Sequence, residues 1–147
     1  MLENKNYSYL LVASQFTCIS LLIIVNLGMF TKSLSIGLFL TGVGFFFYTL
    51  MFNKISNFNI IPDIKNEAKL ITTGPYRYIR HPMYFAVLIT MFAPLSYSFS
   101  STNILISTIL TITMIAKAKK EEFLWSHKFS KYCTYMKKTK MIIPYFI

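Results

Sequence analysis

Charged residues, and acids above all, are scarce in this chain of 147 residues. Only 14% of the sequence is charged, with five acids against 15 lysines and arginines, whereas 54% is hydrophobic. Such a balance leaves too little polar surface to cover a small soluble globule. The composition therefore excludes a soluble domain, and the length favours a single domain over residues 1–147.

Cysteine is rare as well, with one residue in the first apolar stretch and one in the basic C-terminal tail. Cys18 and Cys133 would lie at different levels of a membrane protein, in a reducing setting, so no disulfide is predicted. Cys133 at the membrane surface is either a free thiol, the simpler interpretation, or an acylation site. We also predict no metal site.

Four uncharged hydrophobic blocks predict the fold. They run from Tyr9 to Phe30, Leu34 to Phe52, Pro82 to Phe99 and, more briefly, Ile104 to Ala116. Because about 20 apolar residues cross a bilayer, the chain is expected to be an all-α, polytopic membrane protein with four transmembrane helices, the fourth extended by snorkelling lysines. A cleaved signal peptide is the rival for the first block, but Glu3 and the lack of a small-x-small pattern favour a retained helix.

The second block carries two glycines close together, Gly42 and Gly44. Small residues in membrane helices usually allow two helices to approach closely, which is the interpretation favoured here. The alternative is that the two glycines leave room for a ligand.

The basic residues are unevenly distributed along a chain of net charge +10. The link between the second and third blocks holds Lys54, Lys65, Lys69, Arg77 and Arg80, and a further group of lysines follows the fourth block. The other two links hold only Lys32. The positive-inside rule then places both termini and the middle loop in the cytoplasm. The charge reflects topology first and attraction to anionic lipid second, and a nucleic-acid partner is not expected.

A polar segment from Thr72 to Tyr84 joins the second block to the third. Gly74 and Pro75 predict a tight reversal, and Pro82 fits the first turn of the third helix, with His81 just outside it. The free N–H groups of that turn, the helix dipole and Arg80 form a corner that attracts anions. The plainer alternatives are a packing histidine and an arginine anchored to lipid phosphate. Polar groups at a membrane boundary are costly, however, and tend to mark a site.

After the fourth block the chain is expected to remain helical from Lys117 to Trp125, and this stretch contains two adjacent acids. Glu121 could simply pair with Lys117 one turn earlier. Because successive helical positions point about 100° apart, at most one of Glu121 and Glu122 is expected to face a site. The remaining tail is predicted to form a cytoplasmic interfacial helix.

Two groups of residues follow one another across residues 60–147. The first is Gly74-Pro75-Tyr76 with Arg80-His81-Pro82-Met83-Tyr84, and the second is Glu121-Glu122 with Tyr132-x-x-Tyr135 and Ile143-Pro144. The combination resembles the signature of isoprenylcysteine carboxyl methyltransferases and their bacterial relatives, which are related to phospholipid methyltransferases. The resemblance implies a small integral membrane enzyme, of the bacterial inner membrane, that binds S-adenosylmethionine in a pocket facing the cytoplasm.

The same resemblance implies roles for individual residues. Cofactor contacts are expected from Ala68, Lys69, Leu70, Ile71, Tyr76, His81, Pro82, Met83, Tyr84, Glu121 and Glu122. Lys117 stands where the eukaryotic enzymes have an arginine that meets the substrate carboxylate, and a lysine lacks the planar fork of that arginine. Arg80 and His81 are expected at the catalytic centre, with His81 acting as a base only if the acceptor is an amine. The chain departs from the family pattern between Glu122 and Tyr132, where a Phe-Gly pair is not kept and the spacing is one residue shorter.

The methyl acceptor and two other functions stay open. The acceptor is expected to be lipophilic, either an isoprenylcysteine-like carboxylate, a thiol or a lipid amine, and to enter from the bilayer. An NADPH-dependent, sterol-reductase-like enzyme would also suit Tyr132-Cys133 and Ile143-Pro144, although such proteins are much longer and the glutamate pair favours a methyltransferase. A non-catalytic membrane protein is the third possibility, motivated by Lys117 and the shortened spacing.

Overall fold

A computed structural model of the chain describes residues 4–53, 57–65 and 67–145. Its helices are α1 (Lys5–Val25), η1 (Leu27–Thr31), α2 (Ser33–Asn53), η2 (Gly74–Arg77), α3 (Pro82–Tyr97), α4 (Ser101–Lys128) and α5 (Tyr132–Lys138). Within these residues the only β-type pairing is one isolated bridge, between Ile79 and Lys140. The prediction of an all-α fold is therefore confirmed.

Local sequence signals determine where several helices begin. The side chain of Asn4 accepts a hydrogen bond from the Asn6 N–H at the start of α1, and Ser100 does the same for Asn103 at the start of α4. These contacts satisfy N–H groups that have no partner inside the helix. Pro82 opens α3, where the lack of an N–H costs nothing, and His81 stands just before it as predicted.

Among the described residues, three helices are long and apolar enough to cross a membrane, namely α1, α2 and α4, and α3 is a shorter apolar helix of 16 residues. The four hydrophobic blocks thus correspond to four helices of a polytopic membrane protein. The block that was shortest in the sequence belongs to the longest helix, because α4 runs on past Lys117 for several turns. The helical continuation to Trp125 is confirmed.

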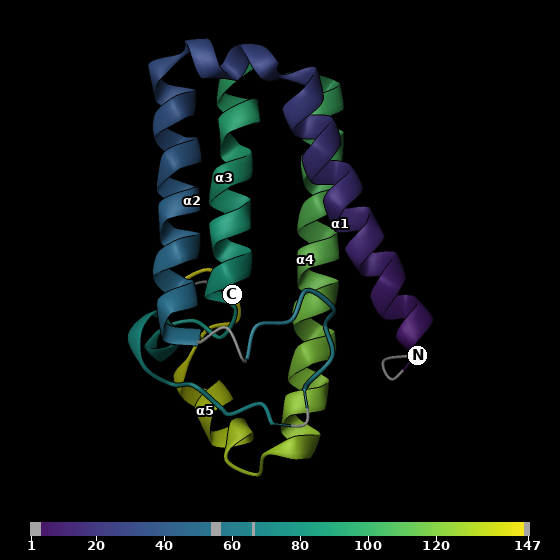
Figure 1. Cartoon of the computed structure of the whole chain (residues 1–147), viewed down its shortest axis with the longest axis vertical. Coiled ribbons are helices and arrows are strands. Elements are labelled where there is room, and N and C mark those ends of the chain that lie inside the picture. Colours follow the sequence, from purple (N-terminus) through teal and green to yellow (C-terminus); the bar gives the residue numbers. More distant parts are fainter. Residues whose placement is uncertain (1–3, 54–56, 66, 146–147) are drawn as a thin grey trace.

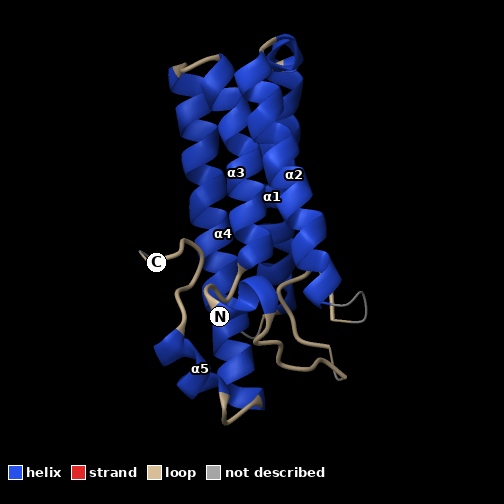
Figure 2. Cartoon of the chain, turned by 90° about the vertical axis from the view of Figure 1, so that its left-hand side faces the viewer, coloured by secondary structure: helices blue, strands red, loops and turns tan. Residues whose placement is uncertain are grey.

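The helices form two packed pairs, α2 with α3 and α1 with α4 (Figure 1). A core of Cys18, Leu22, Met91, Leu110 and Met114 joins α1, α3 and α4. The start of α1, the segment between α2 and α3, and α5 all lie at one end of the bundle (Figures 1 and 2). This arrangement gathers the polar segments that the charge distribution predicted to share one side of the membrane.

The two glycines of α2 differ in their surroundings. A Cβ atom added to Gly42 would lie 2.2 Å from Thr90 Oγ1 and 2.5 Å from the Thr90 backbone nitrogen, whereas one added to Gly44 meets no atom within 4 Å. Gly42 therefore allows the close approach of α2 and α3, as the packing interpretation requires.

Candidate functional site

The site begins with a backbone pairing between two distant segments. The N–H groups of Arg80 and His81 donate to the carbonyls of Lys140 and Met141 at 2.8 and 2.9 Å, and the Lys140 N–H donates to Tyr78 at 3.0 Å. The chain after α5 is thereby attached to the residues that precede α3. The main chain of His81 is thus fixed by its hydrogen bond to Met141, independently of its side-chain contacts.

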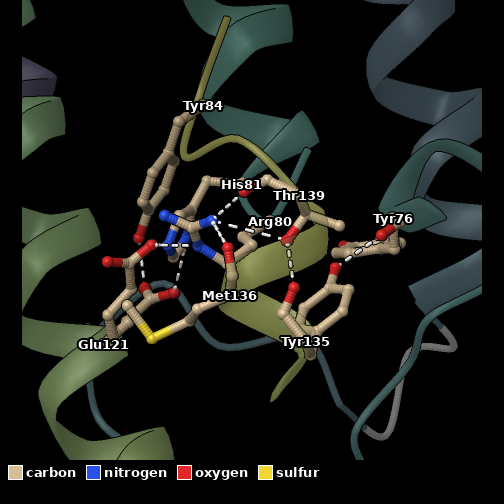
Figure 3. A network of polar contacts seen from close by, with 9 residues as sticks. Tyr76, Arg80, His81, Tyr84, Glu121, Tyr135, Met136 and Thr139 are labelled. Atoms are coloured by element: carbon tan, nitrogen blue, oxygen red, sulfur yellow. Dashed lines mark hydrogen bonds and ion pairs between the residues drawn. The ribbon is translucent and has the colours of Figure 1, made fainter. Parts of the chain in front are cut away.

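Arg80 connects this pairing to α4 and α5. Its Nε donates to Glu122, and its Nη1 donates to the carbonyls of Thr139 and, at 3.2 Å, Met136 (Figure 3). Both carbonyls lie at the C-terminal end of α5, where the helix dipole favours a cation. The side chain is only 10% exposed. The guanidinium thus binds groups of the protein itself, which makes Arg80 a positioning residue in this arrangement.

His81 lies between the two glutamates. Its Nδ1 is 3.4 Å from Glu121 Oε2, its Nε2 is 3.4 Å from Glu122 Oε1, and its ring stacks on Tyr84 with the planes 5° apart. Burial favours the neutral ring, but the two carboxylates favour the imidazolium more strongly, so the pKa of His81 is above its ordinary value. Within the described residues, Nε2 has no hydrogen bond of good geometry.

The two glutamates face different directions, as the helical angle between them predicts. Glu121 accepts a hydrogen bond from the Tyr84 hydroxyl and lines the cavity described below, whereas Glu122 binds Arg80. The ion pair between Glu121 and Lys117 that the sequence offered as the simpler alternative is not formed among the described residues. Lys117 donates instead to Gln15 and to the Ile60 carbonyl.

Two buried lysines of α4 attach the loop after α2 to the bundle. Lys117 holds this loop at the Ile60 carbonyl, 2.9 Å away, and Lys120 holds it through Asp63 at 3.1 Å. Lys120 also donates to the Asn4 carbonyl and to the Ser8 hydroxyl at the start of α1. The loop is thus fixed against both α1 and α4.

Between these elements lies a cavity of about 320 Å³. The predicted site residues that line it are Ala68, Lys69, Leu70, Ile71, Tyr76, Arg80, His81, Met83, Tyr84, Lys117 and Glu121. Two predicted contacts, Pro82 and Glu122, are not among its lining residues; Pro82 is buried in the first turn of α3, and Glu122 binds Arg80. Both halves of the sequence signature therefore meet at one cavity.

Three tyrosines near the cavity stay protonated. Burial raises the pKa of Tyr76, Tyr132 and Tyr135, with nearby glutamates adding to the effect. The Tyr135 hydroxyl donates to the Tyr76 carbonyl at 2.5 Å, which connects α5 to the turn before α3. These side chains can offer hydrogen-bond donors and aromatic faces but no negative charge.

Several lining residues were not predicted from the sequence. They are contributed by α1 (Gln15, Phe16, Ile19), by α2 (Phe46, Asn53), by the loop (Asn57 to Ile61 and Asp63 to Lys65), by α3 (Val87), by α4 (Trp125) and by α5 (Tyr132, Tyr135). One signal was available, because Gln15 is an uncharged but strongly polar residue inside the first hydrophobic block. The apolar residues carried no such signal, since they look like any other membrane-facing side chain.

Comparison with known protein families matches residues 32–132 to the phospholipid methyltransferase family. The matched region includes α2 to α4 and every predicted site residue, but it leaves out α1. A search for curated relatives found no match. The family match favours the methyltransferase interpretation over the reductase.

Proposed function

The chain belongs to the phospholipid methyltransferase family, the membrane methyltransferases related to the enzymes that its motifs resemble, and on this premise we propose that it transfers a methyl group from S-adenosylmethionine to a lipophilic acceptor. The proposal rests on one cavity that is lined by His81, just before α3, by Tyr84, within α3, and by Glu121, on α4. The reaction would occur at the cytoplasmic face of the membrane, where the basic loops point.

The residues at the cavity suit this cofactor. A volume of about 320 Å³ falls in the range of small-molecule sites, roughly 300–1,000 Å³. Glu121 offers a negative charge for a cationic ligand, and Tyr76 and Tyr84 offer aromatic faces for a sulfonium or an adenine. The buried Nε2 of His81, which lacks a well-formed hydrogen bond within the described residues, is a further polar group at the site.

When bound, S-adenosylmethionine supplies a methyl group on a positively charged sulfur, which a nucleophile displaces in line. The task of the protein is to position the reactants and exclude water. Tyr84 and His81 orient the Glu121 carboxylate, while Arg80 holds α4, α5 and the start of α3 together around it. Lys117 and Lys120 keep the loop closed over the cavity.

The environment of His81 bears on the chemistry of the acceptor. A ring held between two carboxylates favours the imidazolium, which has no lone pair to accept a proton. An amine acceptor would need such a base, whereas a carboxylate or thiolate would not. Of the acceptors considered from the sequence, the anionic ones therefore fit this cavity best.

Cofactor binding provides the direct test. Calorimetry of the detergent-solubilised protein with S-adenosylhomocysteine should show affinity in the wild type and a roughly tenfold or greater loss in Glu121→Gln and His81→Ala, because each variant removes a charged hydrogen-bonding group. Lys138→Ala, an exposed position on α5, is the control and should match the wild type. Equal affinity in all four proteins, or binding of NADPH in place of S-adenosylhomocysteine, would contradict the proposal.

A further inference from the structure

Two lysines one turn apart on α4 are both buried but differ in their partners. Lys120 is 0% exposed and lies 3.1 Å from the Asp63 carboxylate. Lys117 is 1% exposed, and its hydrogen bonds go to two uncharged oxygens, Oε1 of Gln15 and the carbonyl of Ile60. Among the described residues, no carboxylate comes within ion-pair distance of Lys117. Glu121, one turn along α4, acts on Lys117 only from beyond ion-pair distance. A buried cation without a counter-charge in contact is costly, so this position favours an additional anion.

Gln15 adds two donors at the same place. An ammonium group can only donate, so the amide of Gln15 must turn its oxygen toward Lys117, and its NH₂ group therefore points elsewhere. The side chain is 9% exposed and lines the cavity. Within the part of the chain that the structure describes, the NH₂ group has no hydrogen-bond partner. This nitrogen is not among the buried side-chain atoms that lack a partner, so it is accessible, and a ligand in the cavity can accept a hydrogen bond from it.

This pair lies where the polar and apolar parts of the cavity meet. Glu121 is one turn beyond Lys117 on α4, and the Lys117 ammonium lies 5.4 Å from the centre of the Tyr84 ring. On the other side, Phe16 and Ile19 follow Gln15 on α1 and also line the cavity. A molecule with an anionic head at Gln15 and Lys117 could extend an apolar tail along α1 while its head stays near the proposed cofactor residues.

We infer that Gln15 selects the methyl acceptor, by binding together with Lys117 an anionic oxygen group, a carboxylate or a phosphate, on a lipophilic molecule. The inference rests on the proposed function and specifies its acceptor. Gln15 lies on α1, outside the region matched to the family. The first helix then serves as a wall of the site as well as a membrane anchor.

Photolabelling with three probes tests the inference without requiring turnover. The probes share one long alkyl chain with a diazirine near the head, and their heads are a carboxylate, a phosphate and an alcohol. The carboxylate or phosphate probe should label residues of α1 near Gln15 at least several-fold more strongly than the alcohol, and the stronger of the two identifies the anion. Equal labelling by the alcohol, or no labelling of α1 by any probe, would overturn the inference.

Two substitutions at Gln15 separate binding from packing. Gln15→Leu removes the donors and should reduce labelling by the anionic probe about tenfold, as expected for a hydrogen bond to a charged group. Gln15→Glu keeps the size but gives Lys117 an internal carboxylate partner, so anion labelling should fall at least as far. If Gln15→Glu labelled like the wild type, the side chain would act only by filling space and the inference would be wrong.

The control and a second readout keep this test separate from the test of function. Ser14→Ala also removes one polar contact between α1 and α4, the hydroxyl pair of Ser14 and Thr113 at 2.9 Å, and it should label like the wild type. Ser14→Ala should bind S-adenosylhomocysteine with wild-type affinity, and both Gln15 variants should lose far more probe labelling than cofactor affinity. If the wild type did not bind S-adenosylhomocysteine, the proposed function would be in doubt. If the wild type bound it and Gln15→Leu were labelled like the wild type, only the role of Gln15 would be wrong.

Discussion

Arg80 links three parts of the chain through one guanidinium, which binds Glu122 on α4 and the carbonyls of Met136 and Thr139 at the end of α5. A lysine keeps the charge but has no planar group that can reach these partners together. Each charged hydrogen bond contributes about 1.5–3 kcal/mol. We therefore expect Arg80→Lys to lower methyl transfer roughly tenfold or more and to lower the midpoint of thermal unfolding.

Methyl transfer is followed with labelled S-adenosylmethionine and membrane extract, by counting label in organic-soluble product. Arg77→Lys, at an exposed arginine on η2, is the matched control and should change neither quantity. Full activity and an unchanged midpoint in Arg80→Lys would contradict this positioning role.

His81 gives the fold a dependence on pH. Its pKa is raised in the folded protein by the flanking carboxylates of Glu121 and Glu122. The stability contributed by the imidazolium is therefore complete below the ordinary histidine pKa of about 6.5 and is lost as the pH rises through the elevated value. We expect the thermal unfolding midpoint to fall over this interval in the wild type and to fall less in His81→Gln. His127→Gln, at the other, exposed histidine, should keep the wild-type slope, and an unchanged slope in His81→Gln would contradict the explanation.

At the scale of helices, the two glycines of α2 provide a paired test of packing. A methyl group at Gly42 would collide with the backbone of Thr90 on α3, whereas a methyl group at Gly44 meets open space. Forcing an extra methyl group into a packed contact typically costs about 1–3 kcal/mol. Gly42→Ala should therefore lower the thermal unfolding midpoint, while Gly44→Ala should leave it unchanged or raise it slightly. A similar response in both variants would mean that α2 and α3 do not pack this closely in the membrane.

Helices and short motifs could be predicted from the sequence, because each leaves a local pattern. The four hydrophobic blocks, the proline that opens α3 and the helical continuation through Glu121 were predicted in this way. So was the expectation that at most one of Glu121 and Glu122 faces the site, since only Glu121 lines the cavity. The interval between Glu122 and Tyr132 contains the last turn of α4 and a link over residues 129–131 that leads into α5.

Contacts between distant groups could not be predicted in the same way. Arg80 binds main-chain carbonyls at the end of α5. Because every residue has a carbonyl, the residue types in α5 do not predict this contact. Gln15 and Lys117 lie 102 positions apart, and only the packing of α1 against α4 brings them together. Lys117 and Lys120 look like part of a basic, solvated face in the sequence, yet both are buried. Their environment depends on where the loop after α2 lies, which hydrophobic patterning does not specify.

At the scale of the whole molecule, the distribution of basic residues gives the bundle a direction. The polar end that holds the cavity also holds α5, whereas η1 and the link around Ser98 lie at the opposite end (Figure 1). From the positive-inside rule we expect the basic end to lie in the cytoplasm. The two native cysteines make this orientation measurable, because Cys133 on α5 is exposed and Cys18 is buried in the bundle.

A membrane-impermeant maleimide should react with Cys133 only after the cells are permeabilised. In the variant Cys133→Ser with Ser98→Cys, the new thiol should react in intact cells, because it lies across the membrane from α5. The buried Cys18 serves as the internal control and should react in neither case until the protein is unfolded. Reaction of Cys133 in intact cells would reverse the orientation and put the cavity on the outer face, where cytoplasmic S-adenosylmethionine does not reach it. Reaction of both positions from one side would contradict the spanning bundle itself.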